Sequence, residues 1–154
     1  MWYEVGCSNK ILAWREWRLM LDSLTWDECK DEVAKQWNLV PRVNHYLVID
    51  DIDNWPTPWE LINDDIYCDL SVALGMFYTF VLTSHLSGAD ARLKILKIKD
   101  NWVNLCLVDG GKYVLNWDAG KVVNIPIPQL VGSVFDYSIF DFTDKLDIER
   151  DECE

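Results

Sequence analysis

The 154-residue sequence is poor in histidine, in basic residues and in closely spaced cysteines. His45 and His85 are its two histidines, so any chemistry that needs an imidazole base depends on one of these positions. The five cysteines are odd in number and form no C-x-x-C pair. This spacing argues against a disulfide framework or a zinc site and favours a reducing compartment. We therefore expect no cofactor and no metal.

Basic residues number 14 against 26 acidic ones, which gives a formal charge of −12. Such a surface repels phosphate backbones and anionic lipids, so direct binding to nucleic acid or to a membrane is not expected. An acidic protein can instead mimic DNA and inhibit a host enzyme. The carboxylates that would form a phosphate-like stripe are Asp50, Asp51, Asp53, Asp64 and Asp65.

The chain also lacks a long apolar run. Residues 70–84 form the nearest candidate, which is shorter than the ~20 residues needed to cross a bilayer. The first residues do not combine a basic region with an apolar stretch, so no secretion signal is expected. Half of the residues are apolar and nine are tryptophan, which predicts a folded chain with a sizeable core.

Two amphipathic helices are expected near the start of the chain. Ser8 is placed to cap a helix over residues 10–23, in which apolar residues recur at helical spacing. Thr25 and Glu28 have the spacing of a capping box, which predicts a second helix over residues 26–37.

Two further helices are expected in the middle of the chain. Thr57 and Glu60 form another capping box, which predicts a short helix. Asp64 and Asp65 are placed to cap the longest helix, over residues 67–85, whose broad apolar face indicates that it is buried.

The periodicity then changes to that of strands. Four short β-rich runs are separated by turn sequences, which predicts an antiparallel meander. These runs are residues 93–98, 102–108, 113–117 and 122–127. Residues 134–142 are apolar and aromatic enough to pack back on the body.

The predicted fold class is therefore α+β, with N-terminal helices and a central apolar helix packed on a small meander. We expect one domain over residues 1–142, with a helical part at 1–45 and a core at 54–127. Residues 143–154 are predicted to form an acidic, mobile tail.

Cys68 lies at the start of the predicted central helix. The positive end of a helix dipole favours the thiolate, so this position suits a reactive cysteine. A cysteine that simply fills the core is the alternative, because cysteine is among the most buried residue types.

The order of elements, with the segments 55–62 (WPTPWELI) and 67–70 (YCDL), resembles the transglutaminase-like branch of the papain-like fold. In that family a cysteine opens the core helix, a histidine follows on the first strands, and an aspartate on the next strand orients it. The resemblance implies that Cys68 matches the nucleophile, Asn101 the histidine position and Asn116 the aspartate position.

Both partner positions therefore carry amides. Asp118 can replace Asn116 only with a shift of two residues. His85 is 17 residues beyond Cys68 on the same predicted helix, about 25 Å away, and His45 would have to approach from a separate segment.

The leading hypothesis is a non-catalytic domain that acts by protein contact. The same motifs resemble small tailed-bacteriophage proteins, which implies a virion or assembly subunit, present in the host cytoplasm and then in the virion, with other virion proteins as partners. Its aromatic anchors would be Trp2, Tyr3, Trp55, Trp59 and Trp117.

The rival hypothesis is a cysteine-dependent amidase or acyl transferase. Cys68 would attack a carbonyl while His45, or a water held by Asn101, manages the proton.

Overall fold

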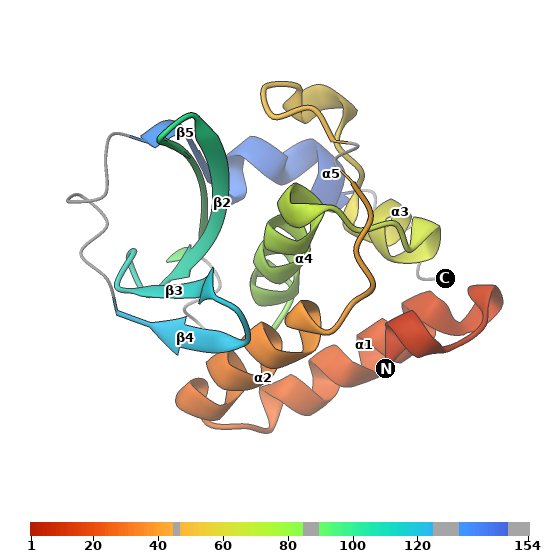
Figure 1. The fold of residues 1–154 in the computed structure, drawn as a ribbon. Coiled ribbons are helices and arrows are strands. Elements are labelled where there is room, and N and C mark those ends of the chain that lie inside the picture. Colours follow the sequence, from red (N-terminus) through yellow and green to blue (C-terminus); the bar gives the residue numbers. More distant parts are fainter. Residues whose placement is uncertain (45–46, 85–89, 125–132, 148–154) are drawn as a thin grey trace.

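A curved antiparallel sheet packs on one side against a group of helices in the computed structural model, which describes residues 1–44, 47–84, 90–124 and 133–147 (Figure 1). Among these residues, no helix is both long enough and apolar enough to cross a membrane. The α-helices are α1 (Lys10–Asp22), α2 (Trp26–Asn38), α3 (Pro58–Asp64), α4 (Asp69–Val81) and α5 (Thr143–Asp147). Short 3-10 helices are η1 (Trp2–Glu4), η2 (Cys7–Asn9), η3 (Ile52–Asn54) and η6 (Ile139–Phe142).

The sheet confirms the predicted meander and extends it by one strand. Its spatial order is β4-β3-β2-β1-β5, and every described pairing is antiparallel. The strands are β1 (Arg92–Ile98), β2 (Asn101–Val108), β3 (Tyr113–Asp118), β4 (Lys121–Val123) and β5 (Ser133–Ser138). The predicted fourth run thus begins as a strand, and its end, residues 125–127, lies outside the described residues.

Helix α4 is the centre of the core. All its residues from Leu70 to Phe80 are buried, as the broad apolar face predicts. Gly75 permits a close approach to α2, because a Cβ at this position would overlap the ring of Trp37. The indole of Trp37 donates a 2.9 Å hydrogen bond to Thr79 Oγ1, which fixes the two helices in register.

An aromatic cluster holds the N-terminal segment on the helices. The ring of Trp2 lies 4.8 Å from that of Trp17 and 4.7 Å from that of Trp37, and its indole donates to the Tyr67 hydroxyl at 3.1 Å. Because Trp2 is fully buried, these contacts make the first residues part of the core.

The capping boxes at Thr25 and Thr57 are confirmed, since each threonine side chain accepts a hydrogen bond from the backbone three residues on. The prediction that Ser8 caps the first helix is wrong. Residues 7–9 form η2, so Asn9 precedes α1 and makes no side-chain capping bond.

The start and length of α4 also differ from the prediction. Asp65 does not cap α4; it ends α3 in a left-handed conformation with φ 54°. The buried ammonium of Lys10, 2.9 Å from its carboxylate, stabilises it there. The N-cap of α4 is Cys68, and the helix ends at Val81 with 13 residues, the same length as α1 and α2.

Residues after β5 return to the body of the molecule. Phe142 is buried against Phe77 and Trp55. The predicted mobile tail begins as helix α5, where Lys145 donates a 2.7 Å hydrogen bond to the carbonyl oxygen of Trp55. Residues 148–154 lie outside the described part of the chain.

Candidate functional site

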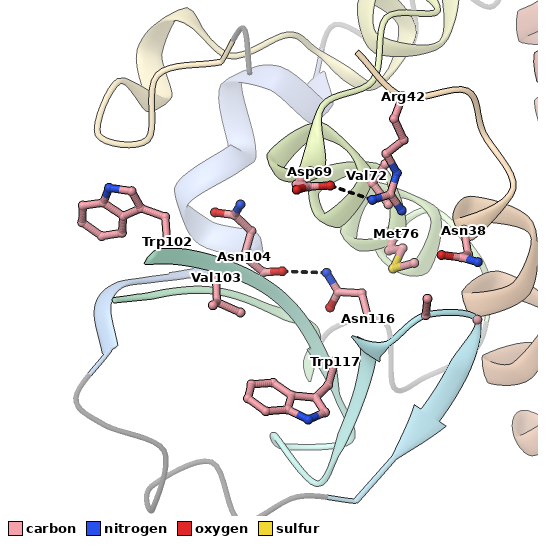
Figure 2. A pocket seen from close by; sticks show the side chains of 12 residues that line it. Asn38, Arg42, Asp69, Val72, Met76, Trp102, Val103, Asn104, Asn116 and Trp117 are labelled. Carbon is pink, nitrogen blue, oxygen red and sulfur yellow. Dashed lines mark hydrogen bonds and ion pairs between the residues drawn. The ribbon is translucent and has the colours of Figure 1, made fainter. Parts of the chain in front are cut away.

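A cavity of about 300 Å³ lies where the start of α4 faces β2 and β3 (Figure 2). A second cavity of about 200 Å³ shares Asp69, Trp102 and Asn104 with it, so the two are neighbours, and we call them together the groove. The residues that line this groove are Asn38, Arg42, Val43, Asn44, Leu47, Ile49, Asp69, Leu70, Val72, Met76, Trp102, Val103, Asn104, Asn116, Trp117, Ala119 and Gly120.

Cys68 is next to this groove but is turned into the protein. It is 2% exposed and lines neither cavity, whereas the two residues after it, Asp69 and Leu70, do line the groove. The hydroxyl of Ser71 accepts a 2.6 Å hydrogen bond from the Cys68 backbone N–H and lies 3.4 Å from its sulfur. The cysteine therefore takes part in capping α4.

Asn116 joins β2 to β3 at the point where the strands separate. The backbones of these two strands are paired at two positions, Leu107 with Val114 and Val108 with Tyr113. Beyond it, the Asn116 side chain accepts a 2.9 Å hydrogen bond from the Cys106 N–H and donates one of 2.6 Å to the Asn104 carbonyl oxygen (Figure 2). An amide can do both, whereas a carboxylate can only accept.

Asn101, the residue expected at the histidine position, is exposed at the start of β2 and pairs with Ile98. It does not line the groove, whereas Trp102 and Asn104 of the same strand do. Alternate strand residues share a face, so Trp102 and Asn104 lie on one face of β2 and Asn101 on the other. The sequence does not mark which face meets α4, because residues 105–108 of this strand are apolar and all buried.

Asn104 carries a polar atom with unmet bonding capacity. Its Oδ1 is buried and accepts no hydrogen bond from any described residue. A buried polar oxygen of this kind costs free energy and is uncommon in folded proteins. Asn104 lines both cavities, so a residue with unmet hydrogen-bonding capacity borders the groove.

Arg42 and Asp69 close one side of the groove. Their charged groups are 2.6 Å apart, with 40% and 79% of the side chains exposed. An exposed ion pair contributes little to stability. Here it orients the chain between α2 and α3 against the start of α4, where Val43 also donates a 2.8 Å backbone hydrogen bond to Tyr67.

The predicted aromatic anchors separate into two groups. Trp2, Trp55 and Trp59 are at most 3% exposed, so they pack in the core and are unavailable to a partner. Tyr3 is partly buried and donates to Gln36 at 2.8 Å.

Trp117 is 39% exposed, as its predicted role requires, and lines the groove with Trp102, which is 41% exposed. Trp102 was not among the predicted anchors.

The other predicted site residues do not meet in the groove. Asp118 is exposed at the end of β3, pairs with Lys121 across the β3–β4 turn, and does not line the groove. His45 and His85 lie outside the described residues, so the prediction about an imidazole base is not tested.

The carboxylates proposed for a DNA-like stripe are partly engaged within the protein. Asp65 is paired with Lys10, and Asp51 accepts a 2.8 Å hydrogen bond from Asn54. In the described part of the chain, no group of three or more metal-binding side chains is close enough together to hold an ion.

Two other buried cysteines, Cys29 and Cys106, are not expected to react as thiolates. Burial raises the pKa of the Cys29 thiol to about 12 and also raises the pKa of the Cys106 thiol. Both therefore stay protonated near neutral pH, so of the three buried cysteines that the structure describes, Cys68 is the one to test for reactivity.

A helical group packed on an antiparallel meander, with a cysteine at the start of the central helix, confirms the predicted α+β fold class. Calcium-bound LapG of Legionella pneumophila has a similar structure, with a TM-score of 0.65 over 82% of this chain and 72% of that protein. The two sequences are 13% identical, so the likeness shows the fold alone. No protein-family model and no curated protein matches the sequence.

Proposed function

We propose that this domain is non-catalytic and binds an extended segment of a partner protein in the groove between α4 and the sheet. The observation that carries this proposal is that Asn104, whose buried Oδ1 no described residue satisfies, lines the groove. A peptide backbone N–H supplies the missing donor.

The lining of the groove supports a peptide ligand. Amide side chains at Asn38 and Asn44 can each donate and accept, which matches the alternating N–H and C=O groups of an extended chain. Val72 and Met76 form part of the apolar wall of the groove, although each is at most 2% exposed. The rigid, half-exposed ring of Trp102 provides a large contact area at low entropic cost.

The same geometry argues against acyl transfer. The Cys68 thiol is buried, and a nucleophile must reach its substrate. On the strands where the family has its base and carboxylate, the polar residues lining the groove are the amides Asn104 and Asn116. Amides do not take up a proton near neutral pH, and Asn116 is already bonded to the backbone of β2.

The partner we propose is a virion or assembly protein of a tailed bacteriophage. The support for this assignment is the resemblance of the sequence motifs, and the groove suits a segment of any extended partner. Co-purification of the chain with virions or with assembly intermediates is the expected result, and absence from both would contradict the assignment.

Peptide selection on the intact protein tests the binding function. Displayed random peptides are enriched on the wild type, and the selected peptides are titrated by tryptophan fluorescence. Asn104→Leu removes the acceptor and is expected to weaken binding about tenfold, the equivalent of ~1.4 kcal/mol. Asn101→Leu, on the same strand but outside the groove, is the matched control and should bind as the wild type does.

Two results would contradict the proposal. One is a failure to select any peptide. The other is equal binding of selected peptides to the wild type, Asn104→Leu and Trp102→Ala.

A cysteine-dependent amidase is the second candidate, favoured by the position of Cys68 as N-cap of α4 beside the groove. Alkylation of the native protein as a function of pH, with Cys68→Ala as control, separates the two functions. A binding domain predicts an inert Cys68. A thiolate that titrates well below ~8.5 would support the amidase instead.

A further inference from the structure

Helix α1 carries an apolar strip on its outer surface. Leu12, Leu19 and Met20 are 54%, 60% and 40% exposed, although the opposite face of the helix buries Trp14 and Trp17. Leu12 and Leu19 are seven residues apart, so they lie along one line of the helix. Figure 1 shows α1 on the side of the helices that faces away from the sheet.

Two charged residues of opposite sign lie between these leucines. Arg15 and Glu16 are exposed, and neither forms an ion pair with another described residue. The apolar residues on either side of Arg15 and Glu16 are arranged symmetrically about the midpoint of this pair. Leu12 and Leu19 are equally distant from it, and so are Ile11 and Met20.

We propose that two copies of this chain associate through an antiparallel pairing of their α1 helices. A two-fold axis at the Arg15–Glu16 midpoint places Leu12 of one copy against Leu19 of the other. The same axis places Arg15 of each copy against Glu16 of the other, forming two equivalent ion pairs. A two-fold contact must be self-complementary in this way.

The charge distribution over the molecule favours the same surface. The chain carries a net charge of −12, so most contacts between copies bring acidic surfaces together. Lys10 and Arg18 of α1 are buried, and the exposed Arg15 and Glu16 cancel each other, so this pair brings no net charge into a contact between two copies.

The contact is small. Helix α1 has 13 residues and is about 20 Å long, so one helix pair buries less than the ~1,200 Å² typical of stable complexes. The dimer is therefore weak and forms in a concentration-dependent manner. None of the residues that line the groove belongs to α1, so each copy keeps its groove, and the inference is independent of the proposed function.

Sedimentation equilibrium of the full chain tests this arrangement by charge reversal. Arg15→Glu and Glu16→Arg each place two like charges opposite each other, and each is expected to weaken dimerisation about tenfold. The double variant R15E/E16R restores both ion pairs with their signs exchanged, so its dissociation constant should return to within about threefold of the wild type.

Apolar variants provide a second, independent readout. Leu19→Ser is expected to give a monomer, whereas Leu39→Ser, at another exposed leucine outside α1, should dimerise as the wild type does. Each side chain is exposed, so thermal unfolding at low concentration should be unchanged and confirms that the variants fold.

The proposal is overturned if the wild type stays monomeric up to about 1 mM, because even a weak dimer with a dissociation constant of that order would be populated there. A double variant that is no better than either single variant would also overturn it, as would an equal effect of Leu39→Ser and Leu19→Ser.

Discussion

The tryptophans of the helical half and those of the sheet have different environments. Trp2, Trp14 and Trp37 are fully buried, whereas Trp102 and Trp117 are about two-fifths exposed and line the groove. The tryptophans of this chain therefore have at least two structural roles. Large rings fill the space between the helices, and two others are held at the surface by the strands.

The packing explains the difference. Trp37 lies against the bare backbone of Gly75 and donates to Thr79, so its position is fixed on several sides. Trp102 has the Lys97 ammonium 5.4 Å from its ring and Phe135 at 6.5 Å, which are loose contacts on one side. Removal of a ring should thus affect stability in the first region and binding in the second.

Trp37→Ala should have the largest effect on stability. The change removes a fully buried ring and leaves a cavity against α4, so the free energy of unfolding is expected to fall by ~3–5 kcal/mol. Denaturant unfolding followed by circular dichroism measures it. A loss below ~1 kcal/mol would show that the helical half does not depend on this ring.

Gly75→Ala tests the same contact from the other helix. The added methyl group would overlap the Trp37 ring, so overpacking is expected to cost ~1–3 kcal/mol even though alanine favours a helix. The double variant with Trp37→Leu should lose less than the sum of the two single losses, because the smaller side chain makes room. Additive losses would contradict the close approach.

Asn104→Leu should move stability in the opposite direction. It replaces a buried acceptor that no described residue satisfies, so the midpoint of denaturation is expected to rise, by about 1 kcal/mol in unfolding free energy. Together with the loss of peptide binding, a stability gain would mark the groove as a functional site. A destabilised variant would show that Asn104 has a structural role instead.

Trp102→Ala and Trp117→Ala should have the smallest effects on stability, within about 0.5 kcal/mol each, because both rings are half-exposed. Each should nevertheless weaken peptide binding, measured by calorimetry when fluorescence is lost. Losses of stability similar to that of Trp37→Ala would remove the distinction between the two regions.

Local signals in the sequence were sufficient for much of the fold. The capping boxes at Thr25 and Thr57 and the turn sequences of the meander involve residues close in the chain, and the structure confirms them. The start of α4 was predicted incorrectly because Asp65 is held at the end of α3 by Lys10, a contact between residues 55 positions apart. Local patterns contain no information about that pair.

The site was harder to predict, since it depends on which face of each strand meets α4. The motif resemblance placed Asn101 at the base position, but Trp102 and Asn104 line the groove. A shift of one residue along a strand exchanges its two faces. The sequence also did not predict that Trp102 is exposed, because the burial of a side chain depends on segments far apart in the sequence.

The bridge made by Asn116 has a consequence for the motions of the sheet. The Cys106 N–H donates its hydrogen bond to the Asn116 side chain of β3, not to the backbone of that strand. Its exchange with deuterated solvent therefore depends on rotation of one amide group as well as on separation of β2 from β3. In Asn116→Ala this single proton should exchange much faster while those of β1 keep their protection, so it reports directly on the opening of the sheet beside the groove.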